Sequence, residues 1–370
     1  MQTIWIEEER LSRILDRNES FWKGELEEGP ITWVTAPGPE PPTPLPEPAR
    51  EESMWTDPEY VVASVERGLA ATHYAGDALP VFNPWLGPDQ FAGWLGGELT
   101  LLPKEFTSWT KPFVENWDDY PELTIDPQNR WWKVYLETLA ASAEAGKGKW
   151  VTGYPDLHTG IDAISAIRGP ERLAMDLVER PETILRAMRQ LTGLWKHVVD
   201  TVSDIILPAG QGASNWTMGW SEKRFLCIGQ NDFSCMISPE MFDSFCLEDT
   251  TKCCNHVDYS LYHLDGPGAV RHVPRLLEIE SLTAVQWIQG AGNPPPSAWL
   301  DLLKRIQGAG KLVQVYYGKG HGGDADLHYE LETLCRVLDP DRLFFWAAVD
   351  SSEEADSLVA HARKLAGGHS

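Results

Sequence analysis

The stretch Leu261–Ala269 reads LYHLDGPGA and joins a buried strand to a tight turn. The segment Tyr259–Tyr262 (YSLY) begins two residues earlier and overlaps this stretch. Its aromatic and apolar residues are typical of a short buried strand. His263 and Asp265 follow, and a Gly-Pro-Gly sequence comes directly after them. Side chains two positions apart leave a strand on the same side. The sequence therefore predicts an imidazole and a carboxylate that leave this strand end together, with space beside them.

Three interpretations of this pair stay open. A neutral imidazole and a carboxylate are both ligands of divalent metals. The same two groups also suit a general base and the partner that orients it. In the structural alternative, Asp265 caps a helix that begins near Val270, and His263 packs under the turn.

The length and the charge narrow the class of protein. The chain has 370 residues, which exceeds one ordinary domain but fits a single α/β barrel with extensions. It carries 31 Lys and Arg against 55 Asp and Glu, a net charge of −24. This excess argues against nucleic acid or an anionic membrane as a partner and agrees with a small-molecule substrate.

The sequence also predicts the cellular compartment. Its first residues show no basic segment followed by an apolar one, so we expect no signal peptide. No apolar run approaches the length of a membrane span. The six cysteines form no C-x-x-C pair. We therefore expect a cytoplasmic protein with free, buried thiols.

The order of the expected elements predicts an α/β fold. A helix over residues 7–17, a strand over 31–35 and a proline-rich connector over 37–48 form an N-terminal arm, residues 1–56. From residue 57 to 370, helices alternate with strands expected at 81–83, 150–154, 212–216, 226–230, 261–263, 284–289, 312–317 and 343–347. About eight such repeats predict a (β/α)8 TIM barrel with the arm packed on its outside. A doubly wound open sheet is the alternative, and no strand is followed by the glycine motif of a dinucleotide site.

Residues just after each strand of such a barrel meet at one mouth. We therefore expect one cavity lined by Asn83, Trp85, Tyr154, Asp156, His158, Trp216, Asp232, His263, Asp265, Trp287, Gln289, Tyr317, His321, Trp346 and Asp350. Basic residues are nearly absent from this set and aromatic ones are frequent. Aromatic rings beside carboxylates favour a cationic or flat apolar ligand, although part of the 17 Trp must simply fill the core.

Three segments carry a resemblance to a known superfamily. They are ISPEMFDSF (residues 237–245), LYHLDGPG (261–268) and LFFWAAVDSSEEADSLV (343–359). In order and spacing they resemble the uroporphyrinogen decarboxylase-like superfamily, which includes decarboxylases and cobalamin-dependent methyltransferases. The resemblance covers the chain from about residue 57 to the C-terminus and implies a (β/α)8 barrel, often as a homodimer.

The resemblance also implies where the chemistry lies. In the methyltransferase branch, a His-x-Cys pair at this strand end and a cysteine near the last strand hold zinc. This chain has His263-x-Asp265, and near the last strand it has Asp350 and no cysteine. Oxygen ligands bind zinc less well than thiolates do, which leaves open whether a metal binds. The arginine-rich substrate motif of the decarboxylase branch has no counterpart here, so we do not expect uroporphyrinogen as the substrate.

Three functions therefore compete. The first is a methyltransferase or demethylase for a small methylated substrate, with a corrinoid (cobalamin), free or on a partner protein, and zinc or another divalent metal as cofactors. The second is a lyase or decarboxylase for a small organic acid without a metal. The third is a binder of a flat cofactor. In the first two, His263, Asp265, Asp232 and Asp156 are the expected catalytic residues, and His263, Asp265, His321 and Asp350 are the candidate metal ligands.

Overall fold

A computed structural model describes residues 5–319, 321–322 and 324–367. Its strands are β1 (Ile31–Pro37), β2 (Thr72–Gly76), β3 (Val81–Phe82), β4 (Leu99–Leu102), β5 (Thr107–Thr110), β6 (Val151–Thr152), β7 (Phe225–Gly229), β8 (Tyr259–Asp265), β9 (Ala284–Ile288), β10 (Leu312–Tyr317) and β11 (Leu343–Ala348). Its helices are α1 (Glu8–Lys23), α2 (Ser53–Thr56), α3 (Pro58–Ala70), α4 (Gln90–Trp94), α5 (Arg130–Ala145), α6 (Gly160–Arg168), α7 (Pro170–Glu179), α8 (Pro181–Ile206), α9 (Pro239–Phe245), α10 (Leu247–Cys254), α11 (Gly266–Ala269), α12 (Val273–Leu277), α13 (Leu300–Gly308), α14 (Leu327–Val337) and α15 (Ser352–Gly367).

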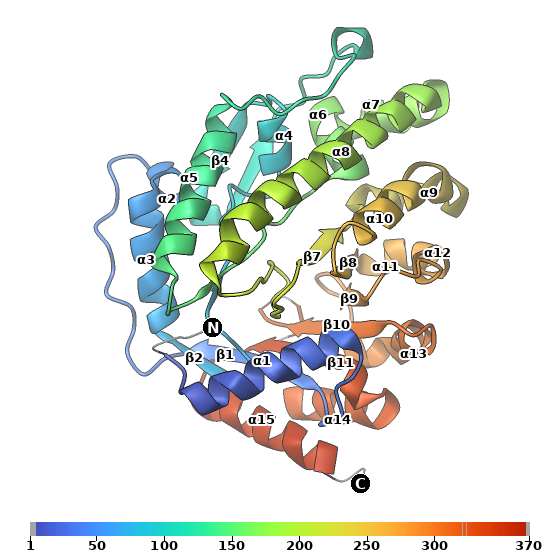
Figure 1. The fold of residues 1–370 in the computed structure, drawn as a ribbon. Helices are drawn as coiled ribbons and strands as arrows, with labels where there is room; N and C mark the ends of the chain where they lie inside the picture. Colours follow the sequence, from blue (N-terminus) through green and yellow to red (C-terminus); the bar gives the residue numbers. More distant parts are fainter. Residues whose placement is uncertain (1–4, 320, 323, 368–370) are drawn as a thin grey trace.

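The main sheet of the described residues has seven strands in the order β2-β1-β11-β10-β9-β8-β7. All neighbours run parallel except β1 and β2, which are antiparallel. Strands β7–β11 lie in the middle of the molecule with helices around them (Figure 1). The predicted α/β class with a mostly parallel sheet is therefore confirmed.

The predicted closed barrel is not seen in the hydrogen bonding of the described residues. Strands β3 and β6 form a separate parallel pair, and a single bridge links Tyr154, just after β6, to Asn215. The edge of β1 that faces away from β11 pairs with the antiparallel β2, which is the last strand of the sheet on that side. The curved sheet is barrel-like, but its ladder stays open on both sides of the β3–β6 pair.

Two cores hold the fold together. The larger core lies between the strands and the surrounding helices and includes Trp195 of α8 and Leu303 of α13. The smaller core contains side chains from the other face of the strands, among them Trp33, Leu261 and Phe344. Alternate residues of one strand therefore belong to different cores, as expected for a sheet buried on both faces.

Helix α1 closes the smaller core at the end where the parallel strands begin. The ring of Trp22 lies 4.1 Å from that of Phe225, the first residue of β7, and Phe21 lies 5.7 Å from Phe344 near the start of β11. The indole N–H of Trp22 donates to the carbonyl oxygen of Trp220 at 2.9 Å. Burial of such large aromatic surfaces makes α1 part of the core.

The prediction that residues 1–56 pack on the outside is wrong for α1 and β1. Strand β1 lies inside the sheet, between β2 and β11, and α1 covers the smaller core. The reason is a pairing between segments about 300 residues apart, which no local pattern indicates. The division of the chain at residue 57 into arm and barrel stays a prediction. Helix α3 begins at Pro58, where the Asp57 carboxylate accepts from the backbone N–H groups of Glu59 and Tyr60.

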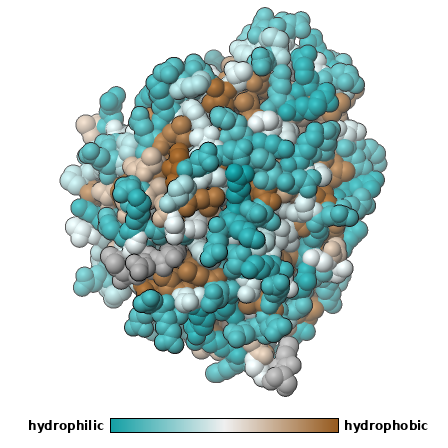
Figure 2. All heavy atoms as spheres, viewed as in Figure 1, coloured by the Kyte–Doolittle hydropathy of each residue, from teal (hydrophilic) through white to brown (hydrophobic). Residues whose placement is uncertain are grey.

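The surface and the thiols agree with the composition. Hydrophilic side chains cover most of the face seen in Figure 2, and hydrophobic ones form separate areas between them. In the described part of the chain, no helix combines the length and the apolar character of a bilayer span. All six cysteines are free, and Cys235 is exposed while the others are buried.

Candidate functional site

Three polar side chains sit side by side on the inner face of the sheet. His263 of β8 is in register with Gln286 of β9, which is in register with Gln314 of β10. Nδ1 of His263 lies 2.5 Å from Oε1 of Gln286, and Nε2 of Gln286 donates to Oε1 of Gln314 at 2.8 Å. The chain of hydrogen bonds ends where Nε2 of Gln314 donates to the carbonyl oxygen of Thr217 at 2.9 Å.

This chain of hydrogen bonds fixes the proton on His263. The carbonyl oxygen of Thr217 can only accept, so Gln314 must turn its NH2 group towards it and its oxygen towards Gln286. Gln286 then presents its own oxygen to His263. In the neutral imidazole, Nδ1 therefore carries the proton and Nε2 keeps its lone pair.

The surroundings of His263 keep it neutral. Its burial lowers its pKa, against the raising effect of its hydrogen bond to Gln286. The Trp216 ring lies 4.8 Å from the imidazole. Nε2 makes no hydrogen bond to any residue of the described chain, so its lone pair is available for a proton or a ligand. Asp265 is exposed at the end of β8, and its side chain does not cap α11, so the capping alternative is not supported.

A second polar group follows strands β6 and β7. Nε2 of His158 lies 3.2 Å from Oδ2 of Asp156 and also contacts the Gln230 side chain. Burial on its own would lower the pKa of His158, but the Asp156 carboxylate and its neighbours outweigh burial and raise this pKa to about 9. His158 is therefore an imidazolium at neutral pH.

Two further carboxyl groups lie beside His158. Asp162 of α6 accepts the backbone N–H groups of Asp232 and Phe233, each at 2.9 Å. Asp232 is exposed, but loss of water around its carboxyl and the nearby Asp162 carboxylate raise its pKa to about 7. Burial also raises the pKa of Asp162. His158, Asp162 and Asp232 line one cavity of about 350 Å³. This cavity can hold a small molecule beside groups that exchange protons near neutral pH.

The two polar groups belong to one electrostatic environment. The Asp156 carboxylate raises the pKa of His263 and the His158 ring lowers it, although burial is the largest influence. Burial, Asp162 and Asp265 all raise the pKa of Asp232. Of the predicted set, Asp156 and His158 are in contact and His158 shares a cavity with Asp232, while the charges of Asp156 and Asp265 act on His263 and Asp232.

Several buried polar atoms after the strands lack hydrogen-bond partners within the described chain. They are Oδ1 of Asn83, both amide atoms of Gln289 and Nδ1 of His321. Each unsatisfied buried group costs about 1–3 kcal/mol, so such atoms are usually matched by water or by a ligand. Their position after the strands suits recognition of a polar molecule there.

Three predicted substrate-binding residues face the outer helices instead of the mouth. The Tyr154 hydroxyl bonds to Ser203 of α8 at 2.7 Å, and the Tyr317 hydroxyl donates to Glu330 of α14 at 2.7 Å. The Trp287 ring lies 4.9 Å from that of Trp299. All three belong to the larger core, between the strands and the surrounding helices. A strand residue next to an inward-facing one points outward, which corrects these three predictions.

The other predicted residues lie in three places. The Trp85 ring packs 5.5 Å from the Trp55 ring of α2. Trp346 and His321 both lie against the Tyr316 ring, at 4.1 and 5.8 Å. Asn83 and Gln289 follow β3 and β9, as predicted.

The candidate metal ligands are not gathered into one set. Asp350 is exposed just after β11, and His321 lies beside Tyr316. Among residues 5–319, 321–322 and 324–367, no group of three or more His, Cys, Asp or Glu side chains is arranged to hold a metal ion. His263 and Asp265 supply at most two ligands, whereas a catalytic zinc site uses three.

The sequence analysis missed Asp162, Gln286 and Gln314. The two glutamines stand inside apolar strand segments, VQW and VQV, at positions of the same parity in neighbouring strands. A polar residue inside a run of this kind was the available signal, since a buried amide needs a partner.

No protein-family model matches this sequence, and no curated protein matches it either. The fold is similar to that of a methyltransferase from Methanosarcina mazei, with a TM-score of 0.61 and 13% sequence identity. The similarity covers 95% of this chain and 98% of that one. At this identity the likeness concerns the fold, which this chain shares with a methyltransferase over nearly its whole length.

Proposed function

We propose that this protein is an enzyme that removes a methyl group from a small polar molecule bound at the strand ends around His263 and Asp232. The observation that carries the proposal is the pairing of a neutral His263, whose Nε2 is unprotonated, with the proton-bearing groups His158 and Asp232. The likeness in fold to a methyltransferase supports the reaction class. Membership of the uroporphyrinogen decarboxylase-like superfamily belongs to the same proposal.

The residues have distinct roles in this reaction. The bond between the methyl carbon and a heteroatom of the substrate breaks, its electron pair stays on the heteroatom, and the methyl group passes to an acceptor. A corrinoid, free or on a partner protein, is the acceptor that we propose. Asp232 in its protonated form, or the His158 imidazolium, supplies the proton that the heteroatom gains. Nε2 of His263 accepts a hydrogen bond or binds an electrophilic atom.

A resident metal does not fit the described side chains. His263 and Asp265 provide two donors, and no third protein ligand lies with them in the described chain. The proposed reaction therefore uses only the acid–base groups of the protein.

One observation favours decarboxylation as a second candidate. The His158 imidazolium lines the 350 Å³ cavity, and a cation there suits a carboxylate substrate. After loss of carbon dioxide, Asp232 would protonate the carbanion that remains.

The two reactions are separated by their products. Purified protein is incubated without oxygen with cob(I)alamin and small methylated amines, ethers or thioethers, and consumption of cob(I)alamin is followed by absorbance. Small carboxylic acids are tested in parallel for release of carbon dioxide. We expect methyl transfer that His263→Ala reduces at least about 100-fold and that the surface control Trp109→Ala leaves unchanged. Release of carbon dioxide without methyl transfer would establish the second candidate, and transfer unaffected by His263→Ala would refute the site.

A further inference from the structure

A second cavity lies at the opposite end of the strands from His263. Its volume is about 210 Å³, and it lies among α1, α15, the beginning of β1 and the end of β2. Its lining includes Arg13 and Arg17 of α1 and Arg363 of α15. Thr32, near the start of β1, marks this as the end where the parallel strands begin. Three arginines around one small cavity are unusual in a chain with a net charge of −24.

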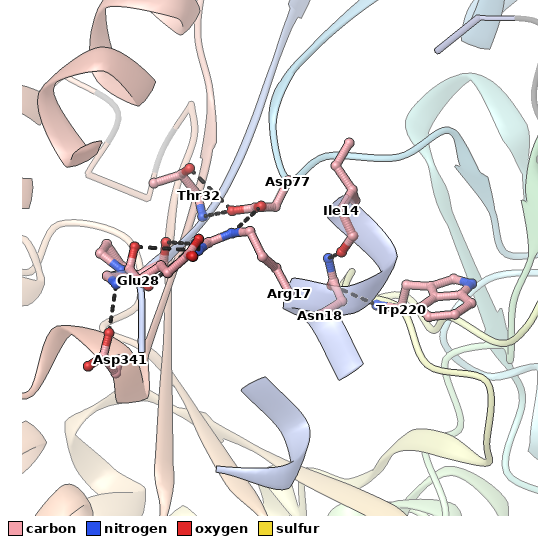
Figure 3. Close-up of polar contacts among 10 residues, drawn as sticks. Ile14, Arg17, Asn18, Glu28, Thr32, Asp77, Trp220 and Asp341 are labelled. Atoms are coloured by element: carbon pink, nitrogen blue, oxygen red, sulfur yellow. Dashed lines mark hydrogen bonds and ion pairs between the residues drawn. The ribbon is translucent and has the colours of Figure 1, made fainter. Parts of the chain in front are cut away.

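Arg17 lines this cavity and is held in place by Asp77 and by the backbone near Glu28 (Figure 3). Its Nε donates to Oδ1 of Asp77 at 2.8 Å, and one terminal nitrogen donates to the carbonyl oxygen of Pro30 at 2.9 Å. The other carboxylate oxygen of Asp77 accepts the backbone N–H of Thr32 at 2.8 Å. Asp77 is thus fully used inside the protein, and Arg17 is held rigidly. A side chain at Gly76 would come within 2.2 Å of the Thr32 carbonyl oxygen, so the backbone is closely packed here.

The other arginines have no such partners. Within the described chain, Arg13 and Arg363 are exposed and make no hydrogen bond or ion pair. Arg10 lies near them: its burial lowers its pKa most, and the positive charges of Arg13 and Arg363 lower it further, although Asp356 raises it. The positive charges of Arg13 and Arg363 therefore both act on Arg10, whose own guanidinium donates to the Tyr74 carbonyl oxygen.

The nearby carboxylates pair with Arg17 and His73 and leave Arg13 and Arg363 without an ion pair in the described chain. Asp356 is 2.9 Å from His73, and Asp77 is held by Arg17 and Thr32. Glu28 lies 3.6 Å from Arg17, but its side chain is 78% exposed, so water screens this pair strongly. An anion inside the cavity would give the unpaired guanidinium groups of Arg13 and Arg363 a partner.

We propose that this cavity is a binding site for a small oxyanion, a phosphate or carboxylate group held between Arg13 and Arg363 against the wall formed by Arg17. Guanidinium groups match both oxyanions with two parallel hydrogen bonds. The volume suits inorganic phosphate or the anionic end of a small metabolite. Because the site lies at the opposite end of the strands from His263, its ligand is distinct from the substrate of the proposed reaction.

The test compares anions at matched ionic strength. Thermal unfolding and titration calorimetry are recorded with phosphate, with citrate and with chloride for the wild type, for the double variant Arg13→Gln/Arg363→Gln and for Arg172→Gln. Arg172 is an exposed arginine on α7 and serves as the matched control. We expect saturable stabilisation by phosphate or citrate in the wild type and the control, and an affinity lower by about tenfold or more in the double variant.

Each outcome decides the proposal. Stronger binding of phosphate than of citrate identifies a phosphate ligand, and the reverse order identifies a carboxylate. Equal stabilisation by chloride at the same ionic strength would overturn the site, as would unchanged phosphate and citrate affinity in the double variant. Circular dichroism of the variants confirms that they fold, which the exposure of both arginines favours.

Discussion

Nδ1 of His263 and Oε1 of Gln286 lie 2.5 Å apart on neighbouring strands, and this contact decides which imidazole nitrogen faces the site. The direction of the contact is inherited from the Thr217 carbonyl through Gln314. The Thr217 carbonyl, which reaches His263 only through two glutamine side chains, therefore determines which nitrogen of His263 carries the proton.

Replacement of Gln286 tests this relationship. In Gln286→Met, Nδ1 loses its acceptor and the imidazole is no longer held in one tautomer, so we expect kcat/KM to fall by about 10- to 100-fold. In Gln286→Glu, a carboxylate replaces the amide and raises the pKa of His263. Activity should then return in part, with the acidic limb of the pH profile moved to higher pH. Equal losses and identical pH profiles in both variants would contradict the assignment.

Asp232 should determine the alkaline limb of the reaction. Its pKa is raised to about 7 by burial and by Asp162, so the proton-donating form prevails below that pH and is lost above it. We expect kcat/KM to decline as the pH rises through about 7, and we expect this decline to be absent from the low remaining activity of Asp232→Asn. A carbon NMR titration of the aspartate carboxyls checks the pKa without a substrate. A midpoint near 4 for Asp232 would contradict the prediction.

The buried Asp249 should make the free energy of unfolding depend on pH. It is buried on α10, where the Thr192 hydroxyl donates to it, and its burial raises its pKa to about 6. The folded state thus binds the proton more tightly than the unfolded state does. The associated stability is present below about pH 4 and is lost as the pH rises through about 6, in total about 2–3 kcal/mol.

Denaturant unfolding of Asp249→Asn between pH 4 and pH 8 should show a smaller loss of stability than the wild type shows. The control Asp16→Asn changes an exposed carboxylate on α1 and should leave the wild-type slope intact. An unchanged slope in Asp249→Asn would refute the attribution.

The contribution of α1 to the core is testable by truncation of Trp22. This side chain is 2% exposed and packs on Phe225, so Trp22→Ala should lower the free energy of unfolding by about 3–5 kcal/mol. Trp109 is 48% exposed, and Trp109→Ala should cost less than about 1 kcal/mol. Urea unfolding measures both. Similar losses would mean that α1 rests on the surface, as the sequence had suggested.

The two donors His263 and Asp265 should bind zinc weakly. We expect wild-type protein purified without chelators to lose zinc on gel filtration, because two protein ligands are too few for tight binding. Asp265→Cys replaces an oxygen ligand by a thiolate and should retain more zinc, as measured by elemental analysis. His263→Ala in the same background should abolish that gain. Stoichiometric zinc in the wild type would show that further ligands join these two.

The outcome at individual residues shows what the sequence can reveal. His263, Asp232 and His158 were predicted because polar residues directly after an apolar run mark a strand end. Trp287 was misplaced because β9 is apolar on both faces, and alternation cannot tell which face is inner. Gln286, the residue before Trp287, is the polar residue that marks which face of β9 is turned towards His263. The orientation of a doubly buried strand becomes known only from its neighbours.

The place of β1 was beyond local patterns for a different reason. Its expected strand was confirmed, but its partner β11 begins at residue 343. A pairing across this distance depends on the whole intervening chain, and nothing in residues 31–37 specifies it.

The pairing of β1 with β11 has a consequence for biosynthesis. Strand β1 is made long before its parallel neighbour, because β11 begins only at residue 343. Until then, Trp33 and the apolar face of α1 have no permanent cover. Contacts between such distant segments slow folding and leave adhesive surfaces exposed in the nascent chain. A fragment that ends before β11 should therefore leave this surface uncovered and aggregate more readily than the full chain.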